Sequence, residues 1–140
     1  MYIETMLLTK ESDVYSFGVV LFEVLCSRLC VDYTYDDYRR SLPVLVNKCY
    51  HEQSLDTIVD INLRNQMEQN SYDMFVSLAY QCLERDQKKL PSMGSVVSKL
   101  QTALEYQVQS DVLAKNVNVA SSSRPSSTSD DIPKTSTLSL

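Results

Sequence analysis

The fold is decided by residues 12–25, which read SDVYSFGVVLFEVL. Apolar side chains fill most positions after Asp13, and Glu23 is the only later charge in the run. The four residues before Asp13, TKES, supply a helix start, because a hydroxyl can cap the first turn and an acid favours the positive end of the helix dipole. We predict a helix from about Asp13 to Ser27. It is apolar on most of its circumference and therefore belongs at the centre of a domain.

Further helical segments follow this central helix. The predicted segments are a helix at roughly 44–52 after Pro43, a short helical turn at 55–59, a helix capped at 70–71, and a helix opened by Pro91-Ser92. The last two carry apolar residues at a spacing of three and four. With only two glycines and four prolines among 140 residues, turns are scarce and a many-stranded sheet is disfavoured. We predict an all-α fold of about four helices around residues 13–27.

Composition excludes several classes of protein. The net charge is −5 and no block of Lys or Arg occurs, which argues against a general nucleic-acid or acidic-membrane surface. The longest uninterrupted apolar run, Phe17 to Phe22, is far too short to span a bilayer. The four cysteines show no C-x-x-C spacing and lie within or beside apolar stretches, at positions 26, 30, 49 and 82. We therefore predict reduced thiols in a cytoplasmic protein and no metal site.

Two polar segments carry possible modification sites. Residues 32–38, DYTYDDY, form an acidic, tyrosine-rich connection that is either simply solvated or a site of phosphorylation or docking. Residues 109–140 become rich in Ser and Thr and are predicted to form a disordered tail that could accept phosphate. We therefore divide the chain into a helical domain at 1–108 and a tail at 109–140.

Two motifs resemble one family. Residues 12–25 closely resemble the central helix of the large, C-terminal lobe of protein kinases, in the form found in plant receptor-like serine/threonine kinases. Residues 80–83, YQCL, followed by LPSM at 90–93, are similar to the closing helices of the same lobe. The resemblance covers about Tyr2 to Gln107, and its first motif is highly specific. It implies that the chain is a helical C-terminal part of a kinase domain.

The resemblance assigns structural roles but no catalytic ones. Asp13 would be the acid that accepts hydrogen bonds from backbone amides of the catalytic loop, with helix capping as its simpler role. Gly18 would allow close helix packing. The motifs that phosphoryl transfer needs, a Gly-rich loop, a phosphate-binding lysine, H-R-D and D-F-G, are absent from the sequence. We therefore expect no catalytic, cofactor-binding or metal residue in this chain, whereas the complete family domain uses ATP and magnesium.

Leu90 departs from the family pattern. Kinases normally carry an arginine here, which pairs with the glutamate of an A-P-E-like segment that this sequence lacks. An unpaired buried arginine would cost on the order of 3–5 kcal/mol. We therefore expect Leu90→Arg to lower the stability of the chain.

Two functions remain open at this stage, beside a third interpretation in which the chain is an unstable remnant with no function. The first is a truncated serine/threonine kinase domain, a transferase in signal transduction whose complete relative phosphorylates Ser and Thr of proteins at the cytoplasmic face of the plasma membrane. The alternative is a non-catalytic helical binding module or decoy for kinase partners. In either case the expected partners are proteins, namely remaining kinase segments or signalling proteins, and not nucleic acid.

Overall fold

A computed structural model describes residues 9–122, with side chains to residue 117. Within these residues the chain is helical, with one isolated antiparallel bridge between Val31 and Ser41 and no strand. This confirms the predicted all-α fold. The helices are α2 (Lys10–Cys26), α3 (Leu42–His51), α4 (Ile61–Gln66), α5 (Gln69–Cys82) and α6 (Met93–Ser122), joined by 3-10 turns at Tyr38–Arg40, Leu55–Thr57 and Gln87–Lys89. By contacts the chain divides into two units, Met1–Gln107 and Val108–Leu140.

Helix α2 begins at a reciprocal cap. The Ser12 backbone N–H donates to Thr9 Oγ1 at 3.0 Å, and the Thr9 N–H donates to Ser12 Oγ at 3.0 Å. This capping box satisfies two amides that the first helical turn leaves without partners. The helix ends at Ser27, whose φ of 52° is left-handed and turns the chain away from the helix axis.

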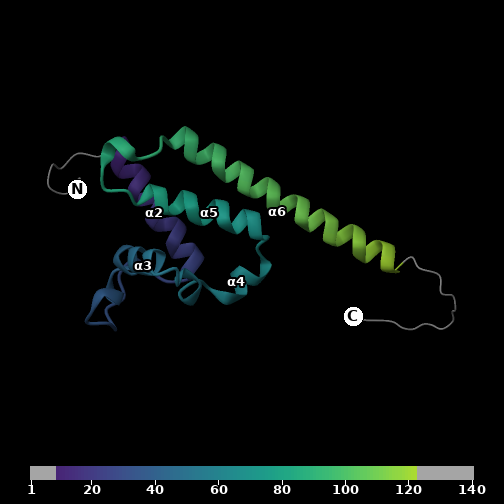
Figure 1. Cartoon of the computed structure of the whole chain (residues 1–140), viewed down its shortest axis with the longest axis horizontal. Coiled ribbons are helices and arrows are strands. Elements are labelled where there is room, and N and C mark those ends of the chain that lie inside the picture. The colour runs from purple at the N-terminus through teal and green to yellow at the C-terminus, as the bar shows by residue number, and fades with distance from the viewer. Residues whose placement is uncertain (1–8, 123–140) are drawn as a thin grey trace. The chain divides into compact units, whose positions relative to one another are not determined.

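The core forms where α2 packs against α5 and α3 (Figure 1). Phe22 and Leu25 of α2 are at most 1% exposed. They lie in a cluster with buried side chains of α3 and α5, which include Leu42, Val46 and Ala79. A second, smaller cluster joins the start of α2 to the end of α5 and the start of α6 through Val14, Leu78, Cys82 and Val96. The predicted central helix therefore does hold the helical domain together.

Two local predictions differ from the structure. Residues 61–66 form the short helix α4, although we expected residues 60–62 only to end a turn. Asp60 caps it by accepting hydrogen bonds from the N–H groups of Asn62 and Leu63. Helix α5 begins at Gln69 with Glu68 as its cap, and not at residues 70–71, because the Glu68 carboxylate accepts from the Ser71 N–H at 2.9 Å.

The predicted disorder of residues 109–140 is wrong for its first part. Residues 109–122 continue α6 to Ser122. They contain neither Gly nor Pro, so each adds to a helix already nucleated upstream, and propagation costs far less than nucleation. The remaining part of the predicted tail, residues 123–140, lies outside the described residues.

Asp60 gives the fold a pH dependence. A hydrogen bond from the Ser27 hydroxyl, followed by those from the Asn62 and Leu63 amides, lowers the pKa of its carboxyl below the ordinary 3.8. A lowered folded-state pKa contributes stability that is present above about pH 4 and is lost as the pH falls through the folded-state value. We expect Asp60→Ala to lower the urea midpoint at pH 7, with the gap to the wild type closing below pH 4.

The matched control is Asp36→Ala, because the Asp36 side chain is 99% exposed and makes one ion pair at 3.3 Å. Its urea midpoint should stay near that of the wild type from pH 7 to pH 2. A gap between Asp60→Ala and the wild type that stays constant over this range would show that the Asp60 carboxylate does not act as described.

Candidate functional site

One side of α2 stays uncovered by the described residues. Asp13, Ser16, Val20 and Val24 recur at a spacing of three and four and are all exposed, and we call them the α2 face. Val20 is 46% and Val24 57% exposed, on a helix whose opposite side is buried. The α2 face is thus an apolar stripe with a carboxylate at its N-terminal end. The apolar residues that we expected around most of α2 are present, but those of the α2 face are exposed and only those on the opposite side are buried.

Asp13 has no hydrogen-bond or ion-pair partner for its carboxylate within the described residues. Capping of α2 falls to Thr9, so the simpler role that we considered for Asp13 is not the one it fills. The Asp13 backbone N–H donates to the Thr9 carbonyl at 3.1 Å, as an ordinary helical residue does. Its carboxylate therefore lies on the surface, able to accept hydrogen bonds from groups outside residues 9–122.

Gly18 lies on the opposite side of α2, against α5. A Cβ built at Gly18 would lie 2.5 Å from Cys82 Cβ and 3.2 Å from the Ala79 carbonyl oxygen. Real Cβ atoms do not approach another atom so closely, so the two helix backbones meet at a distance that only glycine permits at this position. Gly18 thereby sets how α5 is placed against α2.

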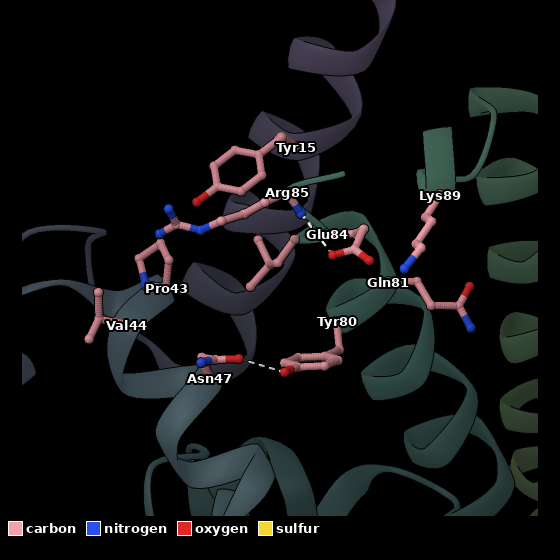
Figure 2. Close-up of a pocket in the computed structure, with 10 residues that line it drawn as sticks. Tyr15, Pro43, Val44, Asn47, Tyr80, Gln81, Glu84, Arg85 and Lys89 are labelled. Carbon is pink, nitrogen blue, oxygen red and sulfur yellow. Dashed lines mark hydrogen bonds between the residues drawn. The ribbon is translucent and has the colours of Figure 1, made fainter. Parts of the chain in front are cut away.

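A groove of about 600 Å³ opens between α2, α3 and the end of α5 (Figure 2). Tyr80 of α5 lies on its wall, where its hydroxyl donates to Asn47 Oδ1 at 2.6 Å and lies 3.2 Å from His51 Nε2. The Tyr80 ring stacks on Tyr50 with centroids 3.7 Å apart. Burial, with smaller contributions from Tyr50 and Glu84, raises the pKa of the Tyr80 hydroxyl.

Charged side chains also line this groove. Arg85 extends toward Tyr15 and Pro43, whereas Lys89 lies on the other side near Gln81 (Figure 2). The Glu84 carboxylate accepts from the Arg85 N–H at 2.9 Å. None of these charged residues was singled out from the sequence. Hydroxyl, amide and charged groups of this kind recognise a polar partner.

The described side chains form no cluster of metal ligands. Among residues 9–122, no group of three or more His, Cys, Asp and Glu side chains is placed to hold a metal ion. His51 lies on the surface, and its Nε2 is 3.2 Å from the Tyr80 hydroxyl. The complete domains of kinases use ATP and magnesium.

The four cysteines are free thiols. Cys26, Cys49 and Cys82 are buried, and Cys30 is half-buried. Burial raises the pKa of the Cys26 thiol to about 11, which keeps it protonated and unreactive near neutral pH.

Among the described helices, none combines the length and the apolar character needed to cross a membrane.

Leu90 is only half-buried. The cost on the order of 3–5 kcal/mol that we expected for Leu90→Arg applies to a fully buried arginine. It lines a cavity of about 340 Å³ together with Glu11 and Glu84. An arginine here can keep its stem on the apolar wall and turn its guanidinium toward these carboxylates. We expect Leu90→Arg to lower the free energy of unfolding by about 1 kcal/mol, measured by urea denaturation.

The control for this variant is Leu90→Glu, which places a third carboxylate in the same cavity. Leu90→Glu should have a lower free energy of unfolding than Leu90→Arg at low salt. Added salt should reduce this difference in free energy, because it screens the repulsion between the carboxylates. Equal stability of the two variants at low salt would mean that the side chain at position 90 does not face Glu11 and Glu84.

Comparison with known proteins identifies the helical domain. Residues 2–100 match the family model described as protein tyrosine and serine/threonine kinase. Three curated relatives from Arabidopsis thaliana are similar to the chain, which is 37% identical to the receptor-like protein kinase FERONIA over 83% of its length. It is 36% identical to ANXUR1 over 79% and 40% identical to HERK 1 over 76% of its length.

The chain spans about 13% of the length of these relatives. The match confirms the resemblance to receptor-like kinases that residues 12–25 and 80–93 carry. Because the family model covers most of the chain, residues 2–100 of 140, the chain belongs to the protein tyrosine and serine/threonine kinase family.

Proposed function

We propose that this chain is the helical C-terminal part of a receptor-like serine/threonine kinase domain and that α2 supports the segments that carry out phosphoryl transfer. The observation that carries this proposal is the α2 face. It combines exposed Val20 and Val24 with an Asp13 carboxylate that has no partner within the described residues.

An exposed apolar stripe on a helix that is otherwise core is stabilised when another segment covers it. Val20 and Val24 offer the apolar surface for such a segment, and the Asp13 carboxylate accepts hydrogen bonds from its backbone amides. Hydrogen bonds to a carboxylate are stronger than those between neutral groups and fix a loop in one geometry. Asp13 is therefore proposed as a positioning residue.

In the complete protein, the proposed reaction is transfer of the γ-phosphate of ATP to Ser and Thr of protein substrates on the cytoplasmic side of a membrane receptor. The 140 residues alone are proposed to be inactive. They contain no H-R-D or D-F-G motif, and their described side chains offer no magnesium site. Phosphoryl transfer depends on groups that position and stabilise the transferring phosphate.

The test uses a chimera with FERONIA, which is 37% identical over 116 residues. The matching part of its kinase domain is replaced by this chain, and phosphate transfer from ATP to a protein substrate is measured. We expect the chimera to transfer phosphate to the substrate. With the 140-residue chain alone, the rate of transfer should equal that of a buffer control without enzyme. Activity of the chain alone would overturn the proposed inactivity.

Asp13→Ala in the chimera tests the positioning role. We expect kcat to fall at least about tenfold, with little change in KM for ATP, because the aspartate orients reacting groups without touching ATP. Asp36→Ala is the control, since Asp36 lies on an exposed loop, and should leave both constants unchanged. A folded Asp13→Ala chimera with the full kcat would contradict the role of the α2 face.

The alternative, a non-catalytic binding module or decoy, is supported by the groove in Figure 2, which offers polar groups for a protein partner. An inactive chimera, together with binding of the folded chain alone to a kinase domain, would favour this alternative.

A further inference from the structure

The connection between α2 and α3 is a loop closed at its base. The Leu42 N–H donates to the Cys30 carbonyl at 2.8 Å, and the Asp32 N–H donates to the Arg40 carbonyl at 2.9 Å. In Figure 1 this loop is the blue segment that extends away from α3. Its tip, residues 33–39, can therefore rearrange while the base holds the ends of the two helices.

Cationic side chains cover the tyrosines of this tip to different degrees. The Arg39 guanidinium lies 4.4 Å from the centre of the Tyr35 ring and also pairs with Asp37 at 2.7 Å. Lys48 lies 5.2 Å from the Tyr38 ring, which is 44% exposed. These contacts hold Tyr35 and Tyr38 against the loop.

Tyr33 differs from both. It is 77% exposed, the most of any tyrosine among the exposed large apolar and aromatic residues, and Arg40 approaches its ring only to 5.6 Å. No hydrogen bond of its hydroxyl is formed within the described residues. The Tyr33 hydroxyl is thus the one in this loop that a second protein can reach most readily.

The turn around Tyr33 is held by local hydrogen bonds that are exposed to solvent. The Asp32 carboxylate accepts from the Thr34 N–H at 3.0 Å and from the Thr34 hydroxyl at 2.6 Å, which sets an Asx-type turn with Tyr33 at its corner. The backbone bond that closes the turn, from the Tyr35 N–H to the Asp32 carbonyl, is long at 3.4 Å. Opening this turn so that Tyr33 enters an active site exchanges these exposed bonds for hydrogen bonds to water and leaves the base of the loop intact.

We propose that Tyr33 is a phosphorylation site for a protein kinase that acts on tyrosines in acidic sequences. In the reaction, Tyr33 Oη attacks the γ-phosphorus of ATP and forms a P–O bond, while the bond from that phosphorus to the bridging oxygen breaks and ADP leaves. The phenolic proton passes to the base of the modifying kinase. The acids that such a kinase would recognise flank Tyr33 at Asp32, Asp36 and Asp37.

Arg40 is the partner for the added phosphate. Its Nε–H donates to the Tyr35 carbonyl at 2.9 Å, while its Nη2 pairs with Asp36 at 3.3 Å, a long contact with a carboxylate that is 99% exposed. A phosphate on Tyr33 adds close to two negative charges at neutral pH and binds guanidinium groups strongly. Phosphorylation therefore moves Arg40 from Asp36 to the phosphate.

The other tyrosines give the internal comparison. Tyr72 is buried and donates from its hydroxyl to Asp56 at 3.0 Å, and Tyr80 is hydrogen-bonded to Asn47 and stacked on Tyr50. Their hydroxyls are bonded within the helical domain. A modifying kinase that acts on the folded chain should therefore discriminate strongly between them and Tyr33.

The experiment incubates the folded 140-residue chain with ATP, magnesium and a purified tyrosine kinase of acidic preference, and maps initial rates by mass spectrometry. We expect Tyr33 to be labelled at least about tenfold faster than Tyr72 or Tyr80. The preference should largely disappear in urea, provided that the kinase stays active there. Tyr33→Phe should remove most of the label in residues 32–38, and Tyr38→Phe, the matched control, should not.

Label that goes mainly to any other tyrosine of the folded chain, or that persists in residues 32–38 of Tyr33→Phe, would overturn the assignment. The role of Arg40 has its own readout. On phosphorylation, the Nη–H resonances of Arg40, whose Nη2 contacts Asp36, should shift in an NMR spectrum while those of Arg39, which is paired with Asp37, stay in place. Equal movement of the two sets of resonances would contradict the exchange of partners.

Discussion

Replacing Phe22 by alanine should lower the free energy of unfolding by about 3–5 kcal/mol, close to the whole stability of many small domains. Phe22 is 1% exposed and lies at the junction of α2 with α3 and α5. Its removal forfeits the burial of an aromatic ring and leaves a cavity that the surrounding helices fill only in part. Urea denaturation followed by circular dichroism gives the change directly.

Val24→Ala on the same helix is the matched control. Val24 is 57% exposed on the α2 face, so this variant should stay within about 0.5 kcal/mol of the wild type. The pair of variants tests which side of α2 faces the core. A Val24→Ala variant as unstable as Phe22→Ala would mean that the α2 face is covered in the isolated chain.

The second large effect is expected at Gly18. Alanine there should destabilise the chain by about 2 kcal/mol: overpacking costs about 3 kcal/mol, and the better helix propensity of alanine returns about 1. The new methyl group would lie 2.5 Å from Cys82 Cβ and 3.3 Å from the Cys82 carbonyl carbon, so it can be accommodated only if α2 and α5 move apart. Thermal melting and urea denaturation both report this loss.

Gly94 supplies the control for Gly18. A Cβ built there would meet nothing nearer than Ser92 Oγ at 3.9 Å. Gly94→Ala should therefore raise the stability by about 0.5–1 kcal/mol through helix propensity alone. If Gly18→Ala also raised the stability, α2 and α5 would not lie as close in solution as described.

The central helix could be predicted because its signals are local. The apolar run of residues 12–25 and the cap before it predict a helix from about Asp13 to Ser27. The structure places α2 at Lys10–Cys26, within about three residues of the predicted bounds at either end. Helix α4 was missed because its six residues have no apolar period, and its cap is supplied by the Asp60 side chain. Residues 109–122 of α6 were predicted to be disordered from their composition. Composition carries no information on whether a helix formed upstream continues into a segment.

The groove could not be predicted, because its walls meet only through tertiary packing. Asn47 and Tyr80 are 33 residues apart, yet the Tyr80 hydroxyl lies 2.6 Å from the Asn47 side chain. A weak signal existed in α3, where Asn47, Tyr50 and His51 share one face by their spacing of three and four. No pattern in the sequence pairs that face with Tyr80. The exposure of the α2 face likewise depends on which elements pack around it.

The closed base of the 32–40 loop allows residues to be inserted at its tip. Because the Leu42–Cys30 and Asp32–Arg40 backbone hydrogen bonds hold the ends together, residues inserted between 33 and 39 change the entropy of closing the loop and the exposed contacts of its tip, such as that of Lys48 with Tyr38. Doubling the length of such a loop costs about 0.6 kcal/mol. An epitope tag or a reporter peptide can therefore be inserted at this tip without disturbing the packing of α2 and α3.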